Sequence, residues 1–264
     1  MTGAGGPLVD RGTAIAVAHR GEPVGHRENT LPALRAAADL GADMVEIDLE
    51  VTRDGHVVLL HDATLRRLWR VRAPVAALDW EEVRPVRDGH RIPGLDEALG
   101  AVACPLMVDF GGEDMADAAA AVVRARTAMD RCLFVSGHVG ALRRLRAVAP
   151  EARIGLTWDR RREPAPALLA ELGAELFNPS WRLLRPGMSE RYHALGCRVS
   201  VWTVDRPRDM RRVLRLGADA VVTNRLARLL QVLGREQGGP VGPVGLVEPV
   251  EPTEPAEPTE PAGG

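Results

Sequence analysis

The 264-residue sequence contains no lysine, so all 34 of its basic residues are arginine. Catalysis by a lysine amine is therefore excluded, including the Schiff-base chemistry that such an amine supports. Aromatic residues make up only 3% of the chain, which argues against the stacking surfaces that bind single-stranded nucleic acid. The formal net charge is −2, so we expect no nucleic-acid partner.

Cysteine is also scarce, and Cys104, Cys132 and Cys197 are widely spaced and odd in number. This pattern favours reduced thiols in the cytoplasm over a disulfide framework. The N-terminal residues carry no apolar signal segment, and no stretch is apolar enough to span a bilayer. We therefore predict a cytoplasmic protein without a transmembrane segment, and the pattern makes no prediction of its oligomeric state.

Composition divides the chain into two parts. Residues 236–264 include the repeat "VEPVEPTEPAEPTEPAGG", which has no aromatic residue and little to bury. We predict a disordered tail there, rich in proline and glutamate. Residues 14–235 have the apolar content of one folded domain.

Within residues 14–235, short apolar runs alternate with segments of helical spacing, which predicts a parallel sheet covered by helices. Eight alternations favour an α/β fold of the (β/α)8 TIM-barrel type over a doubly wound sheet, because the first run is not followed by a glycine-rich phosphate loop. The eight runs are "AIAVAH", "MVEIDLEV", "LMVDF", "CLFVSG", "RIGLTW", "ELFNPS", "RVSVWTV" and "DAVVTN".

Charged side chains occupy the second and third runs, where a buried strand would exclude them. Glu46 and Asp48 are two residues apart, so in a strand they point to the same face. Two carboxylates in one low-dielectric space repel each other, and a cation relieves that repulsion. With Asp109 from the next run they would form an oxygen site suited to Mg²⁺ or Ca²⁺. The alternative is an ion network in which Arg20 pairs with one of the carboxylates.

Two histidines end apolar runs near these acids. His19 ends the first run, and His61 ends the segment "VTRDGHVVLLHD", whose "RDG" predicts a hairpin inserted after the second strand. A hairpin folded over the barrel mouth would bring His61 towards the carboxylates, where both histidines could exchange protons near neutral pH. Trp202 lies late in the seventh run, and we expect it to line the substrate pocket.

These motifs resemble the glycerophosphodiester phosphodiesterase family. The matching blocks are "HRG" at 19–21, "ENT" at 28–30, "GADMVEIDLEVTRDGHVVLLHDATL", "IPGLDEAL", "VSVWTVD" and "LGADAVVTN". The resemblance implies a TIM barrel that hydrolyses glycerol-based phosphodiesters to an alcohol and glycerol phosphate with a divalent cation. By motif position, it implies the metal ligands Glu46, Asp48 and Asp109, the acid/base pair His19 and His61, and a phosphate contact from Arg20.

The chain departs from the family pattern in two places. The family's third strand usually carries Glu-x-Lys, where this chain has Asp109, Phe110 and Gly111. The segment after His61 also lacks the family's usual Arg-Thr-Thr and glycine-rich pattern. Two alternatives therefore stay open: a lysophospholipase D-like activity, which an apolar rim at Leu68, Trp69 and Val71 would favour, or a weakened barrel that binds phosphorylated ligands or a protein partner.

Overall fold

The structure is a computed structural model that describes residues 14–84 and 91–235. The predicted tail, 236–264, lies outside the described residues. Eight parallel strands form a closed barrel, because β1 pairs with both β2 and β9. The barrel strands are β1 (Ile15–His19), β2 (Met44–Val51), β4 (Leu106–Asp109), β5 (Cys132–Ser136), β6 (Arg153–Trp158), β7 (Ala174–Pro179), β8 (Arg198–Val201) and β9 (Ala220–Thr223).

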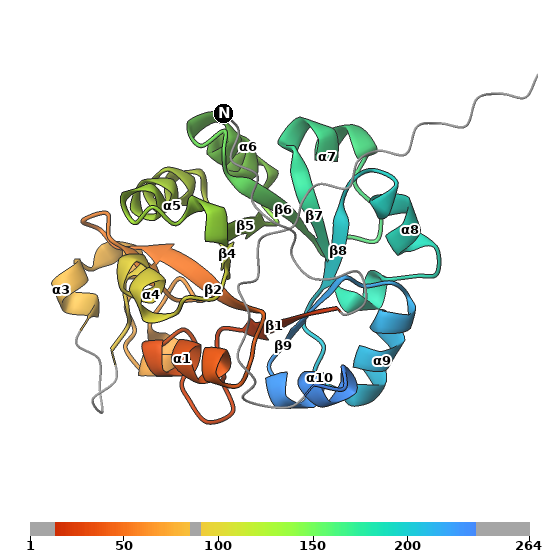
Figure 1. The fold of residues 1–264 in the computed structure, drawn as a ribbon. Coiled ribbons are helices and arrows are strands. Elements are labelled where there is room, and N and C mark those ends of the chain that lie inside the picture. The colour runs from red at the N-terminus through yellow and green to blue at the C-terminus, as the bar shows by residue number, and fades with distance from the viewer. Residues whose placement is uncertain (1–13, 85–90, 236–264) are drawn as a thin grey trace, which may run out of the picture.

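Every predicted strand is therefore found, and the predicted TIM-barrel fold is confirmed. Helices surround the strands on the outside, as Figure 1 shows in a view close to the barrel axis. These helices are α1 (Leu31–Asp39), α4 (Leu95–Ala101), α5 (Glu113–Ala125), α6 (Val139–Val148), α7 (Pro166–Leu172), α8 (Met188–His193), α9 (Pro207–Arg215) and α10 (Leu226–Val232). Two short 3₁₀ helices, η2 (Met129–Arg131) and η3 (Trp181–Leu183), lie in the connections.

The predicted hairpin insertion follows β2. Its strand β3 (Val57–Leu59) pairs antiparallel with the outer end of β2. Helices α2 (Arg66–Trp69) and α3 (Trp80–Val83) and the 3₁₀ helix η1 (Val75–Ala77) complete it, and α3 lies at the edge of the molecule (Figure 1). A separate apolar cluster holds the insertion together: Val58, Leu60, Leu65, Trp69, Val75, Val83 and Ile92.

The alternation of side chains along β2 determines which of them reach the barrel interior. Val45, Ile47 and Leu49 belong to the large core between the strands and the helices. Met44 belongs instead to the smaller cluster inside the barrel. Because a strand has a period of two residues, Glu46 and Asp48 continue the inward face above Met44. The barrel interior therefore changes from apolar to acidic towards the C-terminal ends of its strands.

Candidate active site

The register of the first three barrel strands brings the predicted residues to one level. His19 is the direct neighbour of Glu46 between β1 and β2. Asp48 is likewise the direct neighbour of Asp109 between β2 and β4. In a parallel ladder such neighbours point to the same side, so four functional side chains meet at the C-terminal mouth.

A tight turn after β1 places Arg20 over this mouth. Arg20 adopts φ 60°, and Gly21 follows with φ 85°. A Cβ atom on Gly21 would lie 2.6 Å from the carbonyl carbon of Ala33, so only glycine fits there. The turn directs the backbone N–H of Arg20 to the Glu46 carboxylate, which accepts it at 2.9 Å. This geometry gives a structural reason for the "HRG" motif.

Glu46, Asp48 and Asp109 converge as a carboxylate cluster. One oxygen from each residue lies within 4.8 Å of the others, close enough to share one ion. Three carboxylate oxygens are the donor set that hard divalent cations prefer. The residues present therefore fit a divalent cation.

The cluster carries more negative charge than its surroundings neutralise. Burial and the charges of Asp48 and Asp109 raise the pKa of Glu46 well above its usual value. Burial, then the charge of Asp48, raises the pKa of Asp109 to about 7. Within the described ranges, the one arginine in an ion pair with the cluster is Arg20, whose Nε lies 2.9 Å from Asp48 Oδ2. The predicted pairing of Arg20 with a carboxylate is therefore present, and the cation site stays a prediction that the excess of three carboxylates over one guanidinium favours.

Asn29, which the sequence analysis quoted only within a motif, orients Asp48. Its side-chain Nδ2 donates to Asp48 Oδ2 at 2.7 Å, and its Oδ1 accepts from the Asp48 backbone N–H at 3.3 Å. Asn29 has φ 54°, a left-handed conformation that asparagine tolerates better than most residues. The "ENT" motif therefore supplies a positioning residue as well as the acid Glu28, which pairs with Arg20 at 2.8 Å.

His19 lies inside the mouth with its side chain 16% exposed. Burial, followed by the nearby charge of Arg20, lowers the pKa of His19. Its Nδ1 lies 2.7 Å from Asn224 Oδ1, and because an amide oxygen only accepts, Nδ1 carries the hydrogen. Nε2 therefore has the lone pair, and it faces Glu46 Oε2 at 4.0 Å.

Asp205 fixes the amide of Asn224. The Asp205 carboxylate accepts from the Asn224 backbone N–H at 2.8 Å and from its Nδ2 at 3.0 Å. Because the Asn224 Nδ2 donates to Asp205, the Oδ1 of the same amide must face His19. Asn224 and Asp205 are each the last residue of a quoted family block, "LGADAVVTN" and "VSVWTVD", and neither was predicted to belong to the site. Local pattern could not reveal the contact, because Asn224 and His19 are 205 residues apart.

His61 differs from His19 in exposure, since its side chain is 47% exposed. Its Nδ1 bonds to Asp62 Oδ1 at 2.7 Å, which leaves Nε2 to exchange protons with solvent or a ligand. Arg67 lies behind this pair and donates to both Asp62 and Glu28 at 2.6 Å. The hydrogen bond from Arg67 is the main cause that lowers the pKa of Asp62. Arg67 lies in the segment that departs from the family pattern, and the sequence analysis missed it.

Trp202 lies just beyond β8. Its indole Nε1–H donates to the carbonyl oxygen of Asn178 at 2.8 Å. The ring packs partly buried against the apolar cluster inside the barrel. Trp202 therefore lies above the barrel interior. Its role in lining the substrate pocket stays a prediction.

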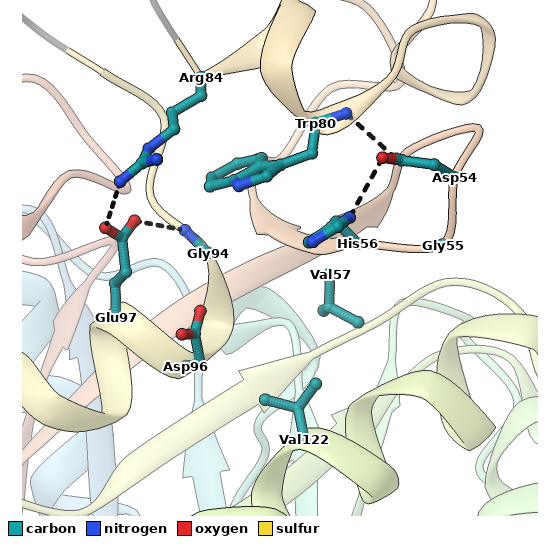
Figure 2. A pocket seen from close by; sticks show the side chains of 10 residues that line it. All are labelled: Asp54, Gly55, His56, Val57, Trp80, Arg84, Gly94, Asp96, Glu97 and Val122. Atoms are coloured by element: carbon teal, nitrogen blue, oxygen red, sulfur yellow. Dashed lines mark hydrogen bonds and ion pairs between the residues drawn. The ribbon is translucent and has the colours of Figure 1, made fainter.

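A cavity of about 480 Å³ lies elsewhere, between the hairpin insertion and α4 (Figure 2). His56 and Trp80 stack there with ring centroids 5.6 Å apart, and Arg84 pairs with Glu97. The cavity contains none of the predicted site residues. We place the candidate active site at the barrel mouth because the titratable groups converge there.

A parallel barrel whose mouth gathers histidines, an arginine and three carboxylates is typical of metal-assisted phosphoryl hydrolases. Residues 19–228 match the family model described as the Glycerophosphoryl diester phosphodiesterase family. The chain belongs to this family, as the sequence resemblance indicated.

Two curated relatives align over nearly their whole lengths. A "Glycerophosphodiester phosphodiesterase" of Caldanaerobacter subterraneus subsp. tengcongensis is 26% identical, and the alignment covers 80% of this chain and 93% of that protein. "Probable glycerophosphodiester phosphodiesterase 2" of Mycobacterium tuberculosis is 30% identical, with 88% and 97% covered. These similarities support the same family assignment.

Solved structures share the fold. An Oleispira antarctica phosphodiesterase in complex with the product sn-glycerol-3-phosphate has a TM-score of 0.80 at 22% identity, covering 84% of this chain and 97% of its own. A glycerophosphodiester phosphodiesterase from Agrobacterium tumefaciens has a TM-score of 0.73 at 25% identity, covering 83% and 99%. Among the helices that the structure describes here, none has both the length and the apolar character needed to cross a membrane.

Proposed function

We propose that the barrel mouth hydrolyses glycerophosphodiesters to an alcohol and glycerol phosphate with the aid of a divalent cation. Family membership supports the reaction. One observation carries the assignment to these residues: the carboxylate cluster lies beside the buried His19. The cluster would bind the cation, and His19 would accept the proton. The product named for the Oleispira antarctica phosphodiesterase, sn-glycerol-3-phosphate, agrees with this reaction.

The two histidines take different roles in this proposal. His19 is the general base, because burial lowers its pKa and its Nε2 holds a lone pair at neutral pH. It removes a proton from the nucleophile, which is either water or a neighbouring hydroxyl of the substrate; attack by the hydroxyl gives a cyclic phosphate, which water then opens to glycerol phosphate. The nucleophile bonds to phosphorus, and the phosphorus–oxygen bond to the alcohol breaks. His61 is the general acid that donates a proton to the departing alkoxide, since its exposure lets solvent reprotonate it.

Arg20 contacts the phosphate in this proposal. Its Nη1 pairs with Glu28 and its Nε pairs with Asp48. The remaining donor group, Nη2, would then donate to a phosphate oxygen of the substrate. Glu46, Asp48 and Asp109 hold the cation. When bound, the cation polarises the phosphate and offsets its charge.

The identity of the cation depends on Asp109. Aspartate is one methylene shorter than the family's glutamate, which shortens its reach by roughly 1.5 Å. Mg²⁺ demands ligands near 2.0–2.1 Å, whereas Ca²⁺ tolerates about 2.3–2.6 Å in looser geometries. We propose that Asp109 binds Mg²⁺ through water or binds Ca²⁺ directly. Gly111 leaves open space beside it, because a Cβ there would meet no atom within 4 Å.

The two alternatives stay open. Trp69 is buried in the insertion's own apolar cluster and Leu68 packs against that cluster, whereas Val71 is 36% exposed, so of the three rim candidates Val71 alone presents an exposed apolar side chain. Asp109 joins the carboxylates, which argues against a weakened, purely binding barrel, while Gly111 still stands where the family has lysine. Cys104, Cys132 and Cys197 are free thiols, in agreement with our proposal of a cytoplasmic location.

The test is alcohol and glycerol phosphate release from a panel of glycerophosphodiesters, with and without Mg²⁺ or Ca²⁺. We expect cation-dependent release that His19→Ala and His61→Ala each reduce by at least about a hundredfold. Release of the alcohol from lysophospholipids alone would favour the lysophospholipase D alternative. Ligand binding without turnover in any condition would contradict the proposal.

A further inference from the structure

Six exposed arginines border the mouth on the side of β6, β7 and β8. Backbone hydrogen bonds hold the three loops that carry them at one level. The Ser180 N–H donates to the carbonyl oxygen of Trp158 at 2.8 Å. The Trp181 N–H donates in turn to the carbonyl oxygen of Trp202 at 3.1 Å. We call the six the arginine rim: Arg160, Arg161 and Arg162 between β6 and α7, Arg182 and Arg185 between β7 and α8, and Arg206 between β8 and α9.

The surroundings of the arginine rim do not neutralise its charge. None of the six side chains forms an ion pair or a hydrogen bond with another residue in the described ranges. The acids of the same loops are Asp159, Glu163 and Asp205. Glu163 is already paired with an arginine of α8 at 2.9 Å, and Asp205 accepts hydrogen bonds from Asn224. The rim therefore has a clear excess of positive charge.

Two tryptophans hold part of the rim in place. The guanidinium of Arg160 lies 5.2 Å from the ring centroid of Trp158, and that of Arg182 lies 4.7 Å from the ring centroid of Trp181. The Trp158 indole N–H also donates to the carbonyl oxygen of Arg162 at 2.9 Å, which fixes the loop. A guanidinium stacked on an aromatic ring keeps its N–H groups free at the edge, where they match a carboxylate.

The chain contains a segment of complementary charge. Residues 236–264 have six glutamates and no arginine or aspartate, so they carry a formal charge of −6 and leave +4 on the rest of the chain. Five of these glutamates recur at every third position from Glu248 to Glu260. Three residues make one turn of a polyproline II helix, so this spacing can present carboxylates roughly 9 Å apart on one side. We call residues 248–260 the glutamate repeat.

The chain is long enough to bring the glutamate repeat to the rim. Arg235, the last described residue, pairs with Asp43 at the N-terminal end of the barrel. Glu248 follows 13 residues later, a length that spans roughly 45 Å when extended. A six-residue strand such as β6 rises only about 20 Å. Because both parties belong to one chain, their effective concentration is about millimolar, enough for exposed ion pairs to form.

We propose that the arginine rim binds the glutamate repeat of the same chain through arginine–carboxylate ion pairs. The bound repeat covers positive charge that would otherwise attract an anionic substrate to the mouth. This consequence for the substrate rests on the proposed hydrolysis of a phosphodiester, whereas the binding of the repeat does not.

Modification of arginine by phenylglyoxal tests the binding on the full-length chain without an assay of turnover. Peptide mass spectrometry gives the rate at each arginine, and the rim arginines should react about threefold faster once the repeat is uncharged, the size that a few exposed ion pairs produce. The difference should vanish near 0.5 M salt, where charges are screened within about 4 Å. Arg66 and Arg70 at α2 are internal controls, because both are exposed without an ion pair in the described ranges. The variant combines five substitutions: Glu248→Gln, Glu251→Gln, Glu254→Gln, Glu257→Gln and Glu260→Gln.

Four outcomes would overturn the proposal. Equal rim rates in the two chains would show that the repeat does not bind there. An equal change at Arg66 and Arg70 would show attraction to positive charge in general. Protection that grows with protein concentration would assign the repeat to the rim of a second copy. Protection that appears only with phosphatidylglycerol vesicles would make the rim a membrane-binding surface.

Initial rates measure the consequence for the substrate. At low salt the five-substituted chain should have a KM for glycerophosphodiesters about threefold below the wild-type value, with kcat unchanged, because more positive charge faces the substrate. An unchanged KM would refute this consequence alone. Absence of turnover in both chains would refute the proposed function, while the modification rates would still decide whether the repeat binds the rim.

Discussion

Asp43 and Glu46 lie three residues apart, yet the two ends of the barrel compensate their carboxylates in opposite ways. Asp43, 5% exposed at the N-terminal end, accepts from the Ala16 N–H at 2.7 Å and from Arg235 Nη1 at 2.5 Å and Nη2 at 2.7 Å. Glu46 at the C-terminal mouth shares its space with two further carboxylates. Removing one partner of a compensated buried pair costs stability, whereas an uncompensated cluster itself costs stability and favours binding of a cationic ligand.

The largest expected effect is at the mouth, where a substitution should lower activity without lowering stability. Glu46→Gln should lower cation-dependent kcat/KM by at least about a thousandfold, because a bound cation contributes several kcal/mol to catalysis. Its melting temperature without cation should hold or rise, since repulsion with Asp48 and Asp109 is relieved. Calorimetry and initial rates on the same preparations test both parts. Unimpaired turnover at low cation concentration would remove Glu46 from the site.

At the N-terminal end of the barrel, a substitution should lower stability without lowering activity. Asp43→Asn should cost about 3 kcal/mol of unfolding free energy, because it leaves Arg235 without its ionised partner. Its kcat should stay close to the wild-type value, since the change lies far from the mouth. Urea unfolding of two truncations sharpens the point: ending the chain at Gly234 should destabilise it, and ending it at Arg235 should not. Equal stability of the two truncated chains would contradict the importance of this ion pair.

Asp109 should give the cation-free protein a characteristic pH dependence. Its pKa is about 7 in the folded protein against an ordinary 3.8, so the folded state binds the proton more tightly. Stability from this group is therefore full below about pH 4 and is lost as the pH rises towards 7. Asp109→Asn should remove this loss, of which about 2 kcal/mol falls between pH 5 and pH 7. Thermal unfolding at pH 5 and pH 7 in a chelator tests it; parallel changes in variant and wild type would contradict it.

The smallest expected effect concerns Asp205, a mouth carboxylate that accepts hydrogen bonds from neutral donors of Thr223 and Asn224. Asp205→Ala should lower kcat about tenfold with little change in KM, because Asn224 loses the contacts that orient it towards His19. Nitrogen NMR of His19 supplies a second measurement, since the variant should populate both tautomers. A single unchanged tautomer would show that Asn224 is oriented without Asp205.

Much of this protein follows from local pattern. The eight apolar runs became the eight barrel strands, because continuous apolar segments between helical ones can bury their surface only in a covered parallel sheet. The period of a strand likewise placed Glu46 and Asp48 on one face, and Asp109 followed from its place at the end of the next run. These conclusions need only neighbours in sequence.

Only the tertiary structure decided how the charges are compensated. Asn224 reaches His19, Arg235 reaches Asp43, and Arg67 joins Glu28 to Asp62. Such pairs form between residues far apart in the chain, and 34 arginines offer too many possible partners for sequence to choose among them. Closure of the barrel determines which charged side chains pair, because it fixes which of them share a space and how little water remains to screen them.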